Sequence, residues 1–203
     1  MSVWPGPRAV SRVDGPAPGG RPPRVLVLGG ARSGKSTWAE QRLAQASAVT
    51  YLATSARDPD DAEWEERVRV HQARRPAHWR TVESLDLARV LLEDDDSPVL
   101  VDCLAVWLAR VLDQAGAWPD EHGARGSERW AEHLDRQVET LLDGLRRTER
   151  EVVLVSNEVG LGVVPETASG RLYRDQLGRL NALVAGVCDE VWLCLAGIAR
   201  RWA

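Results

Sequence analysis

The sequence predicts an α/β fold with a mostly parallel sheet and helices on both of its faces. Strand-like and helix-like segments alternate along the chain, which is the order that β–α–β units require. The strand-like segments are apolar without interruption, as strands buried on both faces are. A glycine-rich segment, residues 29–36, connects the first strand-like run to the first helix-like run. Together these observations favour a parallel sheet between two layers of helices.

Residues 1–23 differ from the rest of the chain. They contain six prolines and four glycines with almost no apolar periodicity, so they bury too little surface to offset the entropy of ordering. We expect a disordered leader there. Residues 24–203 are expected to form a single domain, because a chain of 203 residues lies within the usual size of one compact unit.

The predicted strands and helices follow the leader in order. Uninterrupted apolar runs predict strands at residues 24–30, 49–53, 97–103, 151–158 and 189–197. Other segments predict helices at residues 36–47, 59–75, 85–93, 105–114 and 132–147, and a C-terminal helix through 176–187. The polar segment 116–127 contains glycine and is predicted to be an exposed loop.

The predicted helix 59–75 has clear boundary signals. Asp58 is a predicted N-cap, Pro59 stands at the first helical position, and acidic residues fill the first turn. Pro76 ends the helix, because proline cannot continue its hydrogen-bonding pattern. The segment that follows, 78–83, is predicted to be extended.

The composition excludes several classes of partner. With 26 basic and 30 acidic side chains and a formal net charge of −4, the chain lacks the positive charge that binds nucleic acid. No apolar run reaches the roughly 20 residues of a membrane span, and the N-terminus lacks the apolar stretch of a signal peptide. The three cysteines lie in apolar runs without metal-like spacing, which favours free thiols and a cytoplasmic location. Small molecules are the expected partners.

The glycine-rich segment has the spacing of a phosphate-binding loop. Its sequence, GGARSGKS, fits the pattern G-x-x-x-x-G-K-[ST] between a strand and a helix, the context in which this pattern binds nucleotides. Backbone N–H groups would surround the phosphates at the positive end of the following helix. Lys35 would reach the β- and γ-phosphates, and the Ser36 hydroxyl would bind Mg²⁺. The candidate nucleotide-binding residues of this loop are Gly29, Gly30, Ala31, Arg32, Ser33, Gly34, Lys35 and Ser36.

Two further observations support a nucleotide site. Lys35 is the only lysine in the chain, beside 25 arginines, which indicates a position where lysine is required. Asp102 follows four apolar residues at the end of a predicted strand, where P-loop proteins place a second carboxylate for magnesium. An ordinary loop cap is the alternative interpretation of Asp102.

His71 and His78 are the histidines considered as nucleophiles. His71 falls in the last turn of the predicted helix 59–75, on the same face as Trp64 and Arg67. A neutral imidazole can attack phosphorus, and the ordinary pKa of about 6.5 leaves most of it neutral in the cytoplasm. Neighbouring arginines would lower that pKa and hold phosphate oxygens. A packing role beside Trp64 is the alternative for His71, and His78 is expected to be structural.

Several segments are recognisable together. The phosphate-binding loop is common to many families, but SNEVGLGVVPE is specific, and so is the pattern made by Arg67, His71, Arg75, Pro76, Trp79, Thr81 and Glu83. With YLATS, LVDCL, GRLYRDQLGRLN and DEVWLCLAGI added, residues 24–201 resemble one family. It is the bifunctional adenosylcobinamide kinase / adenosylcobinamide-phosphate guanylyltransferase family of cobalamin biosynthesis.

The resemblance implies two reactions in one active-site region. In the first, ATP or GTP phosphorylates the terminal hydroxyl of the aminopropanol arm of adenosylcobinamide. In the second, the histidine that matches His71 attacks the α-phosphorus of GTP, expels pyrophosphate and holds GMP as a phosphoramidate. The substrate's phosphate then takes the GMP, giving adenosylcobinamide-GDP. The family's fold is that of recombinase-like P-loop NTPases, and its homotrimer implies a homo-oligomer here.

The resemblance also implies roles for individual residues. Lys35 and His71 would be catalytic, and Ser36 and Asp102 would hold Mg²⁺. Nucleotide contacts beyond the phosphate-binding loop would come from Thr54, Ser55, Arg75, Glu83 and Asp102. Glu158 follows Asn157 at the end of a predicted strand and is a candidate base for the substrate hydroxyl's proton, with a structural cap as the alternative.

Other functions fit parts of this pattern. A plain P-loop kinase would use His71 only for packing and would form no covalent nucleotide, whereas another single-activity relative would keep only guanylyl transfer. A non-catalytic nucleotide sensor is expected to have lost a reacting group and to expose an apolar patch. Against the sensor, Lys35, Ser36, Asp102 and His71 are all present.

Overall fold

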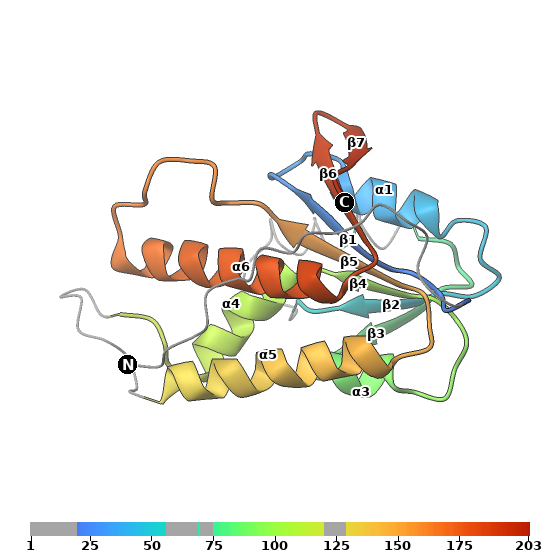
Figure 1. Ribbon diagram of the computed structural model, residues 1–203, viewed down its shortest axis with the longest axis horizontal. Coiled ribbons are helices and arrows are strands. Elements are labelled where there is room, and N and C mark those ends of the chain that lie inside the picture. The colour runs from blue at the N-terminus through green and yellow to red at the C-terminus, as the bar shows by residue number, and fades with distance from the viewer. Residues whose placement is uncertain (1–19, 56–68, 70–74, 120–128) are drawn as a thin grey trace.

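A computed structural model describes residues 20–55, 69, 75–119 and 129–203 (Figure 1). Within these residues the centre is a seven-stranded sheet in the order β3-β2-β4-β5-β1-β6-β7. The strands are β1 (Arg24–Gly29), β2 (Thr50–Ala53), β3 (Arg80–Glu83), β4 (Val99–Asp102), β5 (Val152–Asn157), β6 (Glu190–Leu195) and β7 (Ile198–Arg201). All neighbouring pairs are parallel except β6 with β7. The predicted, mostly parallel sheet is confirmed.

The central strand β1 shows why the strand-like runs are apolar throughout. Val25 and Val27 belong to the hydrophobic core on one face of the sheet, and Leu26 belongs to the core on the other face. Side chains alternate between faces, so a strand covered on both sides has no position for a solvated residue. Because the strands β1 to β6 are parallel, their carboxyl ends meet at one edge of the sheet, where ligands of such folds bind.

Helices cover both faces, as predicted, but unequally (Figure 1). One face carries a layer of helices that buries most of the core, and the other is covered by a helix that packs through Ala39. The larger layer comprises α3 (Leu87–Leu91), α4 (Leu104–Gln114), α5 (Trp130–Arg147) and α6 (Ala168–Val187), and the helix on the other face is α1 (Lys35–Arg42). None of the helices in the described part of the chain has the length and apolar character needed to cross a membrane.

Some elements differ from their predicted bounds. The helix predicted over 36–47 ends at Arg42, because residues 43–46 form successive turns closed by backbone hydrogen bonds. The predicted extended segment 78–83 contains β3. The predicted helix 59–75 lies outside the described residues except for positions 69 and 75, and so do 120–127 of the predicted loop and 1–19 of the predicted leader.

Strand β7 was not predicted. Its sequence, IARR, has no apolar run, and it forms because a tight turn folds it back on β6. Ala196 and Gly197 in that turn have φ angles of 50° and 80°, the left-handed conformation that two-residue hairpins favour.

At the amino edge of the sheet, a buried arginine connects several segments. Arg150, 4% exposed, donates to the carbonyl oxygens of Ser97 at 2.7 Å and Val90 at 2.9 Å. Its Nη2 donates to Thr50 Oγ1 at 2.9 Å and lies 3.3 Å from Asp95 Oδ2. Burial lowers the pKa of Arg150 and the Asp95 charge opposes this, but an arginine stays protonated. Arg150 therefore joins the starts of β2, β4 and β5.

Residues 20–23, which the sequence assigned to the leader, contact the folded part of the chain. Arg21 Nη2 donates to the carbonyl oxygens of Arg146 at 2.7 Å and Leu145 at 3.3 Å, and also to that of Thr148. These hydrogen bonds cap the last turn of α5, whose final carbonyl groups have no partner within the helix.

Candidate nucleotide-binding site at the carboxyl edge of the sheet

The phosphate-binding loop connects the carboxyl end of β1 to the first turn of α1, as the sequence predicted. Gly34 has a φ of 94°, a left-handed conformation that glycine adopts without strain. A Cβ atom at Gly34 would lie 3.2 Å from Gly197 Cα, in the turn between β6 and β7. The N–H of Gly197 also donates to the Ser33 carbonyl at 2.9 Å. The β6–β7 turn therefore packs directly against the loop.

Lys35 is the first residue of α1 and is only 9% exposed. Its Nζ donates to the Gly30 carbonyl at 3.1 Å, so the ammonium group lies over the backbone of the loop itself. Ser33 Oγ is buried and has no hydrogen-bond partner among the described residues. Phosphate oxygens would accept hydrogen bonds from both groups, and the amino end of α1 adds partial positive charge. The loop can therefore bind an anion.

Asp102 lies close to the phosphate-binding loop, although β4 and β1 are not neighbours in the sheet. Strand β5 separates them, and Asp102 Oδ1 is nevertheless 3.5 Å from Ser36 Oγ. A hydroxyl and a carboxylate are hard oxygen donors of the kind Mg²⁺ takes beside waters and phosphates. The described residues contain no group of three or more His, Cys, Asp and Glu side chains that could hold a metal by itself. Ser36 and Asp102 thus fit a magnesium ion whose other ligands would be nucleotide phosphates and water.

Tyr51 is a site residue that sequence reasoning missed. Its hydroxyl donates to Asp102 Oδ2 at 2.7 Å, across the pairing of β2 with β4. The side chain is 2% exposed, and burial, followed by the charge of Asp102, raises the pKa of Tyr51 well above its ordinary value. The phenol is therefore protonated at neutral pH and is the donor. The one signal in the sequence is a tyrosine within an apolar strand, because a buried tyrosine hydroxyl needs a partner.

Thr54 follows β2 and is fully buried. Its Oγ1 donates to the Cys103 carbonyl at 2.8 Å and accepts from the Cys103 N–H at 3.0 Å, so it supports the backbone directly after Asp102. Half-buried Ser55 comes next in the chain. Burial, and then the charge of Asp102, raises the pKa of Cys103 to about 12, so its thiol stays protonated and is a poor nucleophile.

Arg75 and Glu83 lie toward the β3 edge of the sheet. The guanidinium carbon of Arg75 is 3.3 Å from the centroid of the Tyr51 ring, and its Nη1 donates to Thr81 Oγ1 at 3.4 Å. Glu83 is exposed, ends the outer strand β3 and is in register with Ala53. The structure therefore connects Arg75 to Asp102 through Tyr51, and three strands separate Glu83 from β1.

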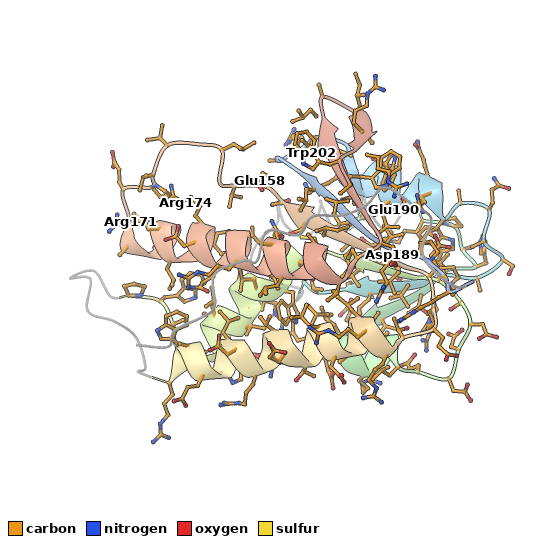
Figure 2. The ribbon with its side chains drawn as sticks, in the orientation of Figure 1. Glu158, Arg171, Arg174, Asp189, Glu190 and Trp202 are labelled. Atoms are coloured by element: carbon orange, nitrogen blue, oxygen red, sulfur yellow. The ribbon has the colours of Figure 1, made fainter. Side chains whose placement is uncertain are left out.

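Strand β5 ends beside the phosphate-binding loop. The N–H of Glu158 donates to the Gly29 carbonyl at 3.1 Å, and Asn181 Nδ2 donates to the Asn157 carbonyl at 2.9 Å. The Glu158 carboxylate accepts from the Gly160 N–H at 2.6 Å, and Figure 2 labels Glu158 where the chain leaves β5. Glu158 therefore combines a capping contact with a place next to the loop.

His71 and Arg67 lie outside the described residues, so the role of His71 stays a prediction. His78 is exposed, in a turn closed by a 3.0 Å hydrogen bond from the Trp79 N–H to the Pro76 carbonyl. Arg75, four positions after His71 in the sequence, stacks on Tyr51. Residues 71–75 are called the histidine segment, and Arg75, the end of it that the structure describes, contacts Tyr51 on β2.

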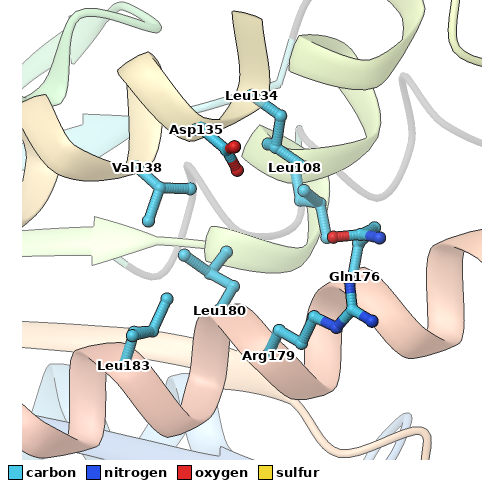
Figure 3. Close-up of a pocket in the computed structure, with 8 residues that line it drawn as sticks. All are labelled: Leu108, Leu134, Asp135, Val138, Gln176, Arg179, Leu180 and Leu183. Atoms are coloured by element: carbon cyan, nitrogen blue, oxygen red, sulfur yellow. The ribbon is translucent and has the colours of Figure 1, made fainter. Parts of the chain in front are cut away.

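A separate hollow lies between α4, α5 and α6 (Figure 3). Its apolar lining includes Leu108, Val138 and Leu180, and Asp135 and Arg179 are among its polar residues. The hollow has room for about one water molecule, which is too little for a nucleotide. The carboxyl edge of the sheet is the better candidate for the functional site.

Comparisons with known proteins identify relatives over most of the chain. A family model described as cobinamide kinase / cobinamide phosphate guanyltransferase matches residues 25–201. The chain is 38% identical over 182 residues to the bifunctional adenosylcobalamin biosynthesis protein CobU of Escherichia coli (strain K12), with 87% of this chain and 98% of that protein covered. It is 41% identical over 179 residues to the bifunctional adenosylcobalamin biosynthesis protein CobP of Pseudomonas aeruginosa, with 86% and 94% covered.

Proposed function

Because the chain belongs to the cobinamide kinase / cobinamide phosphate guanyltransferase family, we propose that its phosphate-binding loop and His71 serve two successive reactions. The chain is a bifunctional enzyme of cobalamin biosynthesis, which phosphorylates cobinamide and transfers a guanylyl group to the product. The observation that carries the proposed site is the approach of Asp102 to Ser36, with 3.5 Å between Oδ1 and Oγ, at the loop that contains Lys35.

In the kinase reaction the phosphate-binding loop orients ATP or GTP. Lys35 compensates the charge that spreads over the transferred phosphoryl group, and Mg²⁺ held by Ser36 and Asp102 would supply further positive charge there. Glu158 accepts the proton of the substrate hydroxyl while that oxygen attacks the γ-phosphorus. The bond from the γ-phosphorus to the bridging oxygen breaks, and the nucleoside diphosphate leaves with the electron pair. The hydrogen bond from the Glu158 backbone N–H to the Gly29 carbonyl, which puts this residue next to the phosphate-binding loop, supports the assignment.

In the guanylyl transfer, a neutral nitrogen of His71 attacks the α-phosphorus of GTP. An N–P bond forms as the bond to pyrophosphate breaks, and the phosphate of cobinamide phosphate then displaces the histidine. We assign Ser55, Arg75 and Glu83 to the nucleotide side of the site. Thr54 acts through the Cys103 backbone, because its hydroxyl is fully buried and engaged there.

Covalent labelling tests the histidine mechanism. The purified protein is incubated with Mg²⁺ and GTP labelled at the α-phosphate, denatured, and examined for label that survives alkali but not acid, as a phosphoramidate does. We expect label on the wild-type protein and on His78→Ala, and none on His71→Ala. An unlabelled wild-type protein that still moves γ-phosphate to cobinamide would contradict the guanylyl-histidine intermediate and leave a kinase.

We further propose that residues 24–203 act as one domain in a cytoplasmic homotrimer. The substrates are adenosylcobinamide or its phosphate, together with GTP and ATP. The resemblance to a trimeric family supports the assembly, and sedimentation of the purified chain tests it: a mass of three chains is expected, and a monomer at micromolar concentration would contradict it.

A further inference from the structure

We propose that Tyr51 is a positioning residue that holds the Asp102 carboxylate so that its Oδ1 faces Ser36. The inference deepens the proposed function, because it rests on a nucleotide and Mg²⁺ binding at Ser36 and Asp102. Tyr51 itself contacts neither the nucleotide nor the metal in this proposal. It acts through the carboxylate.

The two oxygens of Asp102 have different partners. Oδ2 accepts a 2.7 Å hydrogen bond from the Tyr51 hydroxyl, and Oδ1 is 3.5 Å from Ser36 Oγ. The last torsion of an aspartate side chain has a broad energy minimum, so the plane of the carboxylate is set mainly by its hydrogen bonds. The short bond to Oδ2 therefore restricts the directions in which Oδ1 can point.

The Tyr51 hydroxyl has a well-defined position because the ring is fixed by packing. The ring is 2% exposed and belongs to the core cluster that contains Leu100 and Val153, and β2 pairs with β4 so that Tyr51 stands opposite Leu100. Residues that orient metal ligands work best on rigid elements with locked side chains. A buried tyrosine on a strand paired on both sides, as β2 is with β3 and β4, meets this condition.

The Tyr51 ring also contacts the end of the histidine segment. The Arg75 guanidinium carbon lies 3.3 Å from the ring centroid, a cation–π contact, and Arg75 is four positions after His71. One side chain thus touches both the carboxylate on the magnesium side and the segment that contains the proposed nucleophile. Arg75 helps to hold the ring in the orientation that serves Asp102.

The matched pair Tyr51→Phe and Tyr173→Phe tests the inference. Tyr51→Phe keeps the ring and removes the hydroxyl. Tyr173, the only other tyrosine, is also partly buried, and its hydroxyl donates to the Ala105 carbonyl at 3.0 Å rather than to a site residue. Binding of GTP is measured on the full chain by calorimetry over a series of Mg²⁺ concentrations and in EDTA. The GTP carries a methylene group between the α- and β-phosphorus, so that His71 cannot expel pyrophosphate, and melting curves confirm that each variant folds.

Mg²⁺ should strengthen GTP binding, and the midpoint is the Mg²⁺ concentration at which half of this increase in affinity is reached. For Tyr51→Phe we expect the midpoint to rise about tenfold or more, which is the usual effect of removing the hydrogen-bond partner of a metal ligand. Affinity in EDTA should stay unchanged, and Tyr173→Phe should match the wild type in both conditions. An unchanged Mg²⁺ dependence in Tyr51→Phe would overturn the inference, as would equal weakening with and without Mg²⁺. If the affinity of the wild-type protein for GTP does not depend on the Mg²⁺ concentration, the proposed metal site is overturned, and the role of Tyr51 with it.

Discussion

Arg150, at the amino edge of the sheet, and the phosphate-binding loop, at the carboxyl edge, hold their polar side chains in opposite ways. At the amino edge, the guanidinium of Arg150 makes hydrogen bonds of 2.7 to 3.3 Å to Val90, Asp95, Ser97 and Thr50. At the carboxyl edge, the contact between Ser36 and Asp102 is 3.5 Å long and Ser33 Oγ has no partner within the described residues. The polar atoms of the first arrangement are all bonded within the protein, whereas the second has polar atoms that can still bond to a ligand.

The difference follows from the cost of burying polar groups. A buried donor or acceptor without a partner costs about 1 to 3 kcal/mol, so a purely structural group is normally satisfied by the protein. A binding group is satisfied by its ligand instead. By this criterion Ser33 belongs to the site and Arg150 to the scaffold, and the contacts of Lys35 and Ser36 stay within the site, with Gly30 and Asp102. Tyr51 combines the two, because it is fully bonded and serves a residue of the site.

Lys35→Ala should give the largest effect of the substitutions considered, and it should act on catalysis more than on stability. The opposite result would contradict the comparison of the two edges. Because we propose that the Lys35 ammonium group compensates charge on the transferred phosphoryl group, we expect the kcat of the kinase reaction to fall about 100- to 1000-fold. The free energy of unfolding should change by less than in Arg150→Met, since the Nζ hydrogen bond to the Gly30 carbonyl stays within the loop and joins no separate segments. Steady-state kinetics and urea unfolding check the two quantities. A kcat within tenfold of the wild-type value would contradict the assignment.

Arg150→Met should show the opposite pattern. The substitution removes the hydrogen bonds that Arg150 donates to Thr50 Oγ1 and to the carbonyl oxygens of Val90 and Ser97, so the free energy of unfolding should fall by about 3 kcal/mol. At a temperature where the variant is folded, its Kd for GTP should equal that of the wild type. Unchanged stability with weaker GTP binding would reverse the roles of the two edges.

Gly34→Ala should affect both quantities to a smaller extent. The φ of 94° is strained for alanine, and the new Cβ would meet Gly197 Cα at 3.2 Å, so we expect about 1 to 2 kcal/mol of destabilisation and weaker GTP binding. Gly30→Ala is the matched control, because a Cβ there meets nothing within 4 Å and its φ lies outside the left-handed region. Equal stability losses in the two variants would show that the contact with the β6–β7 turn is unimportant.

Asp95→Asn should give the smallest effect, a change with pH in the stability difference from the wild type that is seen only in acid. Hydrogen bonds from Ser97, opposed by partial burial and aided by Arg150 and Arg80, hold the pKa of Asp95 below its ordinary value of 3.8. A carboxylate with a lowered pKa in the folded state stabilises the fold above the ordinary pKa and loses that contribution as the pH falls through the folded value. The difference in melting temperature between the wild type and Asp95→Asn should therefore shrink from pH 5 to pH 3. A constant difference would exclude this linkage.

Much of the fold was predictable because its signals are local. The five predicted strands correspond to β1, β2, β4, β5 and β6, since each is a run of apolar residues between turn signals. Strand β7 was missed because its sequence is polar, and only pairing with β6 across the Ala196–Gly197 turn makes it a strand. The order of the strands, with β5 between β1 and β4, has no signature in any single segment.

The site divides in the same way. The sequence alone determined the phosphate-binding loop and Lys35, because eight consecutive residues contain the chemistry and the backbone conformation it needs. It also indicated Asp102, as an acid at the end of an apolar strand. Only the tertiary structure brings the Tyr51 hydroxyl to Asp102, the Thr54 hydroxyl to the Cys103 backbone and Gly197 into contact with Gly34. Each of these contacts joins residues that only sheet pairing and the packing of turns bring together, and spacing along the chain does not encode such distances.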